Sequence, residues 1–408
     1  MTVAPARFDI PKDFSQQEDP YALLEAIRAS GRVQQVRLRG AVPVWLVTGY
    51  AEAVAALNDP RLSNSLEYGA SVLPGPAEQR RRANVLAWSM LSVDPPDHTR
   101  LRGVVARGFT ARLVEQLKPQ IQELTDGLLD AVAPTGRADL VNDLAFPLPI
   151  AVICRLLGVP YQDHRLFRGW SVGLAMPPAD PDTLRRADAA RAEMTRYFEE
   201  LVPAKRAEPG DDLLSALTQA HAAERLTDTE VVAMAIMLLL SGHETTVCFI
   251  GSAIVAMLRD PGLADAVRRD SALLPPAIEE LLRLNGPVTR GVARFTKEEV
   301  EFGGVRIPAG EMVVVSLAAA NRDPAQFPRP EVVDLARNRN PHLSFGHGMH
   351  HCLGQALARQ QATIALGTVL RRLPDLALAK PLEEVRRWPG MLRGLDELPV
   401  SFTPVVAS

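Results

Sequence analysis

Residues 345–354, FGHGMHHCLG, concentrate side chains that could bind a metal or a cofactor. Their three glycines permit tight turns and let the backbone lie close to a flat object. Cys352 comes just before residues 355–362, a run of strong helix formers, so its sulfur lies at or beside a helix N-terminus. The partial positive charge of that end favours a thiolate, which is a good ligand for a soft or borderline metal.

The residues alone leave three interpretations of this loop open. Cys352 could be a buried structural cysteine, because free cysteines are among the most buried residue types. The nearby histidines could form a zinc or copper site with it, although His351 and Cys352 are adjacent and could hardly both reach one tetrahedral ion. The third interpretation is axial ligation of a haem iron, in which the glycines let the backbone pass close under the macrocycle.

The complete pattern, F-G-x-G-x-H-x-C-x-G, resembles the haem-binding loop of the cytochrome P450 family, the haem-thiolate monooxygenases. Each of its defining positions matches, from Phe345 to Gly354. The resemblance implies that haem b is bound with the Cys352 thiolate as its axial metal ligand. It also implies that Phe345 contacts the cofactor and that His350 reaches a haem propionate.

A second pattern, SGHETT, occupies residues 241–246. Gly242 removes a side chain, so another group can approach the backbone, and Glu244 and Thr245 place an acid and a hydroxyl beside that gap. From the residues alone, a kinked helix with self-satisfied hydroxyls is the alternative. The segment resembles the family's [AG]-G-x-[DE]-T motif, with Ser241 in the small first position. This implies a cofactor-binding Gly242 and a catalytic pair, Thr245 and Glu244, that manages the protons consumed in activating dioxygen.

This second pattern lies inside a long apolar helix. A capping box at residues 227–230 predicts the helix start, and Asp260-Pro261 predicts its end after residue 259. Glu244 is the only formal charge between residues 231 and 258, so a transmembrane span is the rival interpretation. A mid-helix carboxylate is costly in lipid, and we therefore interpret the segment as the central helix of a large core.

Further basic residues could neutralise an acidic cofactor. His98 and Arg102 follow Pro95-Pro96 and share one helix face, which by itself could equally be a solvated basic face. The D-P-P-x-H-x-x-x-R arrangement of the family implies that both side chains bind haem propionates. The position of Arg294 before the turn at residues 300–304 implies the same role for that residue.

Glu280 and Arg283 form an E-x-x-R pattern on a predicted helix. In isolation this spacing would suggest a surface ion pair of little energetic value. The family resemblance instead implies a buried structural network, in which Arg337 is the candidate third member.

Composition limits the other possibilities. The 408-residue chain has a net charge of −3, which argues against a nucleic-acid-binding protein. Its three cysteines are far apart and odd in number, which indicates a reducing compartment, and we expect the protein to be cytoplasmic. Residues 1–20 are polar and contain no apolar run flanked by basic residues, so we expect no signal peptide and no membrane partner.

Together these patterns predict a mainly α fold with small β-sheets, formed by residues 1–408 as one domain. The resemblance implies that the haem lies between the 227–259 helix and the helix after Cys352. The implied function is insertion of one oxygen atom of O2 into a hydrophobic small molecule, by hydroxylation or epoxidation, in bacterial secondary metabolism or catabolism. A peroxide-driven peroxygenase and a non-oxidative haem protein are the alternatives. Only 56 residues follow Cys352, so we expect separate electron donors, a ferredoxin and its reductase. Five apolar residues are predicted to line the substrate cavity: Met237, Leu240, Val288, Val292 and Met391.

Overall fold

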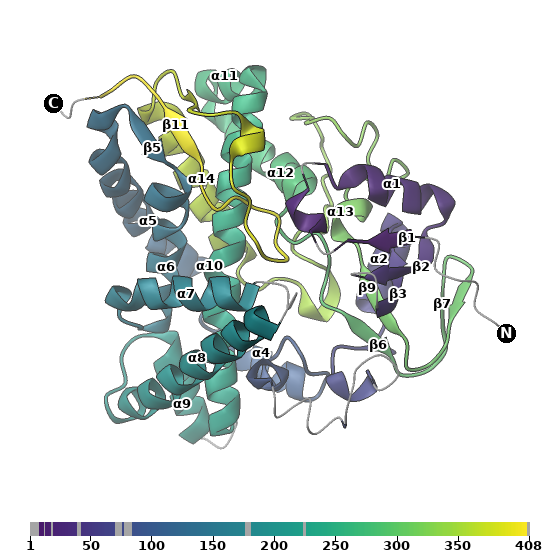
Figure 1. Cartoon of the computed structure of the whole chain (residues 1–408). Coiled ribbons are helices and arrows are strands. Elements are labelled where there is room, and N and C mark those ends of the chain that lie inside the picture. The colour runs from purple at the N-terminus through teal and green to yellow at the C-terminus, as the bar shows by residue number, and fades with distance from the viewer. Residues whose placement is uncertain are drawn as a thin grey trace.

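The computed structural model describes residues 8–11, 13–17, 19–38, 42–69, 76, 84–175, 181–222 and 226–405. Part of the N-terminal segment 1–20 discussed above therefore lies outside the described residues. A helix-rich region lies on one side of the long helix α10, and a smaller region on its other side carries the largest sheet (Figure 1). The mainly α fold with small sheets predicted from the sequence is confirmed.

Several helices of the described residues begin at a side-chain N-cap, and some continue through an internal proline. Their bounds are α1 Tyr21–Ser30, α2 Tyr50–Asn58, α4 Asp97–Ala106, α5 Ala111–Val132, α6 Pro147–Leu157, α7 His164–Ala175, α8 Pro181–Ala207, α9 Leu213–Ala222, α10 Asp228–Arg259, α11 Pro261–Arg269, α12 Leu274–Asn285, α13 Leu317–Ala320 and α14 Gln355–Arg372. The predicted capping box is present at the start of α10, where the Thr227 side chain accepts from the Glu230 N–H and the Glu230 carboxylate accepts from the Thr227 N–H.

The largest sheet has six strands in the order β1-β2-β3-β9-β6-β4. These strands are β1 Phe8–Ile10, β2 Val33–Leu38, β3 Val42–Val47, β4 Leu62–Ser63, β6 Arg294–Thr296 and β9 Met312–Val315. A three-stranded sheet joins β5 Arg137–Asp139, β10 Ala377–Leu378 and β11 Pro399–Ser401, and β7 Val300–Phe302 pairs with β8 Val305–Ile307. The large sheet brings Arg294, at the start of β6, to the side of the molecule that contains α2 and the Cys352 loop.

Helix α10 forms the centre of the helical core. Within the described part of the chain it is the one helix long and apolar enough to cross a membrane, and 78% of its most apolar window is buried inside the protein. It packs against α6, α8, α12 and α14, so protein covers its apolar faces (Figure 1). The interpretation of this segment as a core helix is confirmed, because burial among helices satisfies the same hydrophobicity that lipid would.

Candidate functional site

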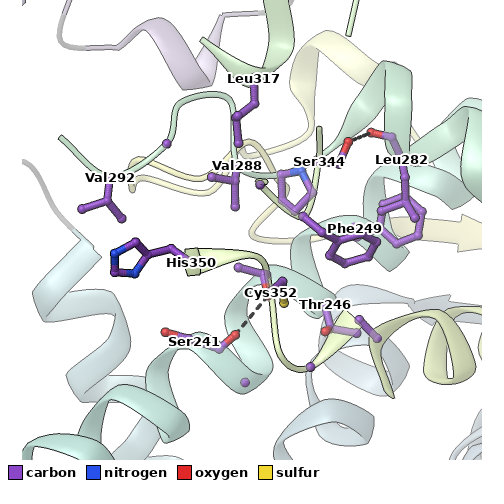
Figure 2. Close-up of a pocket in the computed structure, with 18 of the residues that line it drawn as sticks. Ser241, Thr246, Phe249, Leu282, Val288, Val292, Leu317, Ser344, His350 and Cys352 are labelled. Carbon is purple, nitrogen blue, oxygen red and sulfur yellow. Dashed lines mark hydrogen bonds between the residues drawn. The ribbon is translucent and has the colours of Figure 1, made fainter. Parts of the chain in front are cut away.

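A cavity of about 320 Å³ separates the middle of α10 from the loop that carries Cys352, a volume within the range of small-molecule sites. Figure 2 shows its border, to which α10 contributes Ser241, Thr246 and Phe249, while the loop contributes His350 and Cys352. The remaining lining includes Phe345, Gly242, Thr245, Arg294, Val288 and Val292. Residues of the two motifs, which are more than 100 positions apart in the sequence, therefore meet at one cavity.

The Cys352 loop is shaped by backbone conformations that glycine allows. Gly346 and Gly348 have φ angles of 70° and 74°, in the left-handed region that side chains rarely adopt. A Cβ atom at Gly348 would lie 2.8 Å from the carbonyl oxygen of Leu57, so the loop also needs glycine there to pass α2. The Cys352 N–H donates to the Phe345 carbonyl oxygen at 2.8 Å, and α14 begins three residues later with Gly354 as its N-cap.

The protonation of Cys352 differs from the prediction based on its place at a helix start. Burial raises the pKa of the Cys352 thiol, and the Gly354 N–H together with Arg102 and Arg359 only partly opposes that increase. The desolvation cost of a buried thiolate therefore exceeds what the helix end and these cations provide. A metal cation bound to the sulfur would supply the missing positive charge, since a coordinating thiol loses its proton.

Four basic residues predicted to bind propionates gather at one edge of the cavity. The rings of His98 and His350 lie 4.4 Å apart between centroids. Burial is the main cause that lowers the pKa of His350 to about 3, and the nearby charges of His98, Arg294 and Arg102 contribute to this shift. Burial also lowers the pKa of Arg294 to about 10, although its Nη1 donates to the carbonyls of Ala56 and Leu57. Burial thus disfavours the charged forms of these imidazoles and of the Arg294 guanidinium, and a nearby anion would stabilise them.

The residues present fit a cofactor with carboxylate groups. His98 is 3% exposed, and its Nε2 atom has no hydrogen-bond partner among the described residues. A buried ring nitrogen without a protein partner calls for an explanation, and a ligand atom beside it would provide one. Haem propionates would supply negative charge beside His350 and Arg294 and an acceptor oxygen for the unpartnered Nε2 of His98.

The four basic residues do not have equal access to the cavity. His350 and Arg294 line it, whereas His98 lies behind His350 and Arg102 is turned toward the loop. The Nη2 atom of Arg102 donates to the His351 carbonyl oxygen at 2.7 Å and so ties α4 to the Cys352 loop. The structure therefore gives Arg102 a contact with the loop that the sequence did not reveal.

The predicted pair on α10 is divided between two sides of the helix. Thr245 lines the cavity and its Oγ1 donates to the Ser241 carbonyl oxygen at 3.1 Å. Glu244 is 7% exposed and is absent from the cavity lining, and its Oε1 lies 3.0 Å from His243 Nε2. Consecutive residues of an α-helix point about 100° apart, so an adjacent acid and hydroxyl cannot share one direction.

Gly242 borders the cavity, but the absence of a side chain there makes room for a protein residue, whereas a cofactor was expected. A Cβ atom there would lie 2.7 Å from Ile153 Cδ1 of α6. The glycine is therefore required for helix packing against α6 in addition to any approach of a cofactor. Ile153 itself lines the cavity and was not predicted, because nothing in its local sequence distinguishes it from the other apolar residues of α6.

The predictions for the apolar cavity wall were partly correct. Val288 and Val292 line the cavity, whereas Met237, Leu240 and Met391 do not. Met391 is 59% exposed, so its position late in the chain gave no guide to burial. Sequence reasoning also missed Thr246, which lines the cavity, and His243, which is fully buried beside Glu244. Their only sequence signal was proximity to Thr245 in the same motif.

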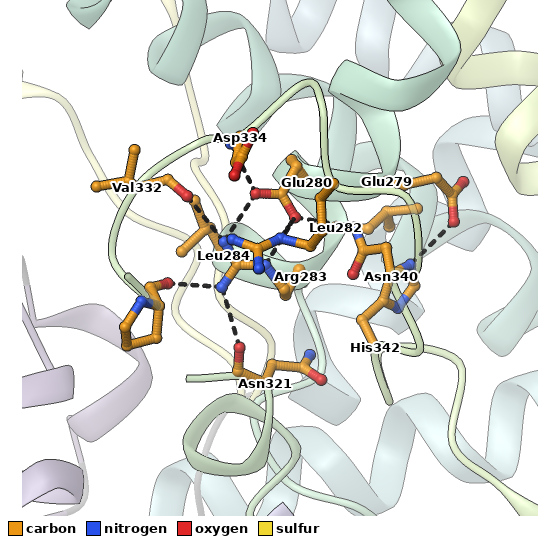
Figure 3. A network of polar contacts seen from close by, with 12 residues as sticks. Glu279, Glu280, Leu282, Arg283, Leu284, Asn321, Val332, Asp334, Asn340 and His342 are labelled. Carbon is orange, nitrogen blue, oxygen red and sulfur yellow. Dashed lines mark hydrogen bonds and ion pairs between the residues drawn. The ribbon is translucent and has the colours of Figure 1, made fainter. Parts of the chain in front are cut away.

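Glu280 and Arg283 form the buried network that the sequence predicted (Figure 3). Arg337 is its third member. The Glu280 carboxylate accepts from Arg283 Nε at 2.8 Å, from Arg337 Nε at 3.0 Å and from Asn340 Nδ2 at 3.0 Å. Burial would raise the pKa of Glu280, but the hydrogen bonds from Arg283 and its neighbours lower it. This network ties α12 to the segment that leads back to the Cys352 loop.

Glu279 is predicted to stabilise the folded protein near neutral pH and to lose this effect in acid. Burial would raise the pKa of its carboxyl group, but hydrogen bonds from Arg359 and His342 outweigh it and lower the pKa from 4.5 to about 2. The resulting stabilisation is fully present above pH 4.5 and is lost as the pH falls toward 2. Because the Glu279 side chain is 30% exposed, solvent screening limits its contribution to the free energy of unfolding to about 2 kcal/mol.

Urea unfolding of wild type and Glu279→Gln, followed by circular dichroism, tests this expectation. The stability difference should be about 2 kcal/mol at neutral pH and should shrink progressively below about pH 4. Glu299, which is exposed, offers a matched control in Glu299→Gln, for which no comparable difference is expected. A Glu279→Gln difference that stays constant down to the lowest accessible pH would contradict the assignment.

Comparisons with known proteins agree with this geometry. The profile of the Cytochrome P450 family matches residues 174–375. The chain is 45% identical over 389 residues to cytochrome P450 monooxygenase PikC of Streptomyces venezuelae, covering 94% of this chain and 91% of the relative. It is 42% identical over 394 residues to the vitamin D(3) 25-hydroxylase of Pseudonocardia autotrophica, covering 95% and 94%. The solved structure of the tirandamycin C-bound P450 monooxygenase TamI superposes with a TM-score of 0.88 at 40% identity, covering 97% of this chain and 100% of that one.

A cysteine loop facing a long helix across a cavity, with buried basic groups at its edge, defines a haem-thiolate protein. The chain belongs to the cytochrome P450 family. It is accordingly a monooxygenase that acts on a small molecule, and its cofactor is a haem held by a cysteine thiolate. A haem-thiolate cofactor favours the haem-ligation interpretation of the Cys352 loop over the structural-cysteine and zinc interpretations.

Proposed function

We propose that Cys352 is the thiolate ligand of this enzyme and that the residues around the cavity divide the remaining tasks. The observation that carries this proposal is that Cys352 lines the cavity beneath α10, while the unpartnered Nε2 of buried His98 belongs to a ring that packs against His350, which also lines the cavity. When bound, the haem supplies the oxygen-activating chemistry. Phe345 and Gly242 border the space it would occupy, and His98, Arg102, Arg294 and His350 would hold its propionates.

Thr245 and Glu244 are proposed to deliver protons, in different positions. Thr245 presents its hydroxyl to the cavity, where it can hold a water molecule or a reacting oxygen by hydrogen bonding. Glu244 lies behind it as a buried acid and would act after rotation of its side chain or through water. Because the apolar wall of the cavity excludes bulk solvent, a hydroxyl backed by an acid is a suitable source of protons there.

The substrate is proposed to be a hydrophobic small molecule of bacterial secondary metabolism or catabolism. Cavity residues such as Leu57, Phe249, Val288 and Leu317 are apolar, which favours an apolar ligand. Vitamin D3 and tirandamycin C, named for two relatives, are reasonable first ligands for a binding screen. We further propose one domain over residues 1–408, a cytoplasmic location, and electron supply by a separate ferredoxin and its reductase.

Absorption spectroscopy of the purified, dithionite-reduced protein with and without carbon monoxide tests the ligand assignment. A strongly red-shifted Soret band is expected, because a thiolate opposite carbon monoxide donates electron density to the iron. A band at the position typical of histidine-ligated haem would contradict Cys352 as the working ligand. Failure to bind haem would contradict the whole proposal.

Thr245→Ala is expected to lower product formed per reducing equivalent by about tenfold and to raise hydrogen peroxide release correspondingly. The physical reason is that the only hydroxyl assigned to hold protons at the cavity is removed while packing is almost unchanged. Product, peroxide and reductant consumption are measured together with a ferredoxin and reductase. Thr245→Ser keeps the hydroxyl and should retain most coupling, and an uncoupled Thr245→Ser with a normal Thr245→Ala would exclude the proposed role.

A further inference from the structure

His243 is a fully buried histidine of α10 that the roles assigned above do not use. Its Nδ1 atom lies 2.6 Å from the Leu239 carbonyl oxygen, one helical turn earlier. Its Nε2 atom lies 3.3 Å from Ser171 Oγ on α7 and 3.0 Å from Glu244 Oε1. Because a carbonyl oxygen can only accept, the Nδ1 atom must carry a proton.

The protonation of Nε2 is then linked to that of Glu244. In a neutral ring protonated at Nδ1, the Nε2 atom presents a lone pair, and an ionised carboxylate oxygen 3.0 Å away would face it with no proton between them. Two states avoid this repulsion, a neutral ring beside a protonated carboxyl group and an imidazolium beside a carboxylate. In each state one proton is carried by either Nε2 or Oε1, so the two groups together hold one proton.

The contact is close without being a completed hydrogen bond. The Oε1 atom of Glu244 is buried, and no donor among the described residues is aligned with it, so the 3.0 Å approach of Nε2 is electrostatic and off the ring N–H axis. A small rotation of either side chain would complete or break the hydrogen bond. Glu244 is therefore held on the far side of α10 from the cavity by a contact that can be released.

The surroundings of His243 come from several elements. Ser171 of α7 contacts the ring directly, and the Phe146 ring, just before α6, meets its edge with centroids 6.1 Å apart. Arg168 of α7 lies 4.5 Å above the same Phe146 ring and pairs with Asp396 at 3.7 Å. Cys248, one turn beyond Glu244, is influenced electrostatically by that carboxyl group. Glu244 is thus the acidic partner in contact with the ring.

We propose that His243 is a positioning residue that shares one proton with Glu244 and holds this carboxyl group away from the cavity until a proton is needed. The inference rests on the proposed role of Glu244 and deepens it, because it assigns control of that acid to the residue before it. Rotation of Glu244 toward Thr245 must then break the contact with Nε2, so the strength of this contact sets how readily the acid becomes available.

Nitrogen-15 NMR of histidine-labelled holoenzyme tests the shared proton in the reduced carbon monoxide complex, which is diamagnetic. The His243 signals are assigned by their loss in His243→Phe. The Nδ1 signal should be that of a protonated nitrogen, because Nδ1 lies against the Leu239 carbonyl oxygen, which can only accept. Glu244→Gln should leave Nδ1 unchanged and shift the Nε2 signal, because the ionisable group that shares its proton with Nε2 has been removed. A protonated Nε2 beside an unprotonated Nδ1, or a spectrum insensitive to Glu244→Gln, would overturn the inference.

Hydrogen peroxide released per reductant consumed, measured without substrate, tests the positioning role. His243→Phe is expected to change this ratio by about threefold or more, whereas His243→Gln, whose amide N–H can still donate to Oε1, should restore part of the effect. Adding His243→Phe to Glu244→Gln should produce no further change, because the two residues act through one contact. A ratio unchanged in His243→Phe would overturn the positioning role even if the NMR signals shift.

Different outcomes would contradict the proposed role of Thr245 and Glu244 and the role assigned to His243. If Thr245→Ala leaves peroxide release unchanged, the proposed proton delivery at α10 is wrong. If Thr245→Ala raises it while His243→Phe and the Glu244→Gln spectrum show no effect, only the inference about His243 is wrong. The carbon monoxide spectrum of each variant confirms that it has folded and bound haem.

Discussion

Replacing Cys352 by serine is expected to abolish the red-shifted Soret band of the reduced carbon monoxide complex. It should also lower dioxygen-dependent turnover by at least about a hundredfold, equivalent to about 2.7 kcal/mol. A serine hydroxyl stays protonated and donates little electron density, so the electron density that the Cys352 thiolate would supply to the haem is lost. The band is measured after reduction with dithionite, and turnover with a ferredoxin, its reductase and a ligand found by the binding screen.

Cys154 provides the matched control for this experiment. It is 1% exposed like a typical structural cysteine, and it does not line the cavity. Cys154→Ala should therefore keep the red-shifted band, at a small cost in stability. A Cys352→Ser protein that retained the band would mean that another residue coordinates the iron, and the assignment of the loop would have to be abandoned.

Arg283→Leu is expected to lower the free energy of unfolding by about 3–5 kcal/mol, the largest effect on stability predicted for this chain. The Arg283 side chain is fully buried, and its Nη1 atom donates to the carbonyls of Asn321 and Pro330 while Nη2 donates to Val332. Its removal leaves these carbonyls without their donor and weakens the neutralisation of buried Glu280. Urea unfolding of the purified protein gives the free energy.

Arg329→Gln is the control for this prediction, because Arg329 also pairs with a carboxylate of the same segment but is 69% exposed. Its partner is Asp334 at 3.1 Å. Loss of this exposed pair should change stability by less than about 1 kcal/mol. Equal effects of Arg283→Leu and Arg329→Gln would show that burial does not determine the strength of the Glu280 network.

The features predictable from sequence were those that depend on residues close together in the chain. The capping box at Thr227, the glycine turns around Cys352 and the helix start after Pro96 each involve neighbours within a few positions. The family resemblance added long-range information, including the pairing of Glu280 with Arg337, which spacing alone could not provide. The apolar length of α10 was also evident, although only packing distinguished a core helix from a membrane span.

Other properties depended on which side chains meet across the fold. The sequence by itself determined that Cys352 would sit in a glycine-rich loop before a helix and that an acid and a hydroxyl would adjoin Gly242. Only the tertiary structure decided that Arg102 would bond the His351 carbonyl, that Ile153 would fill the space beside Gly242, and that Glu244 would turn from the cavity toward His243. The physical reason is that side-chain direction and desolvation depend on neighbours from distant elements, whereas turns and caps depend on local backbone geometry.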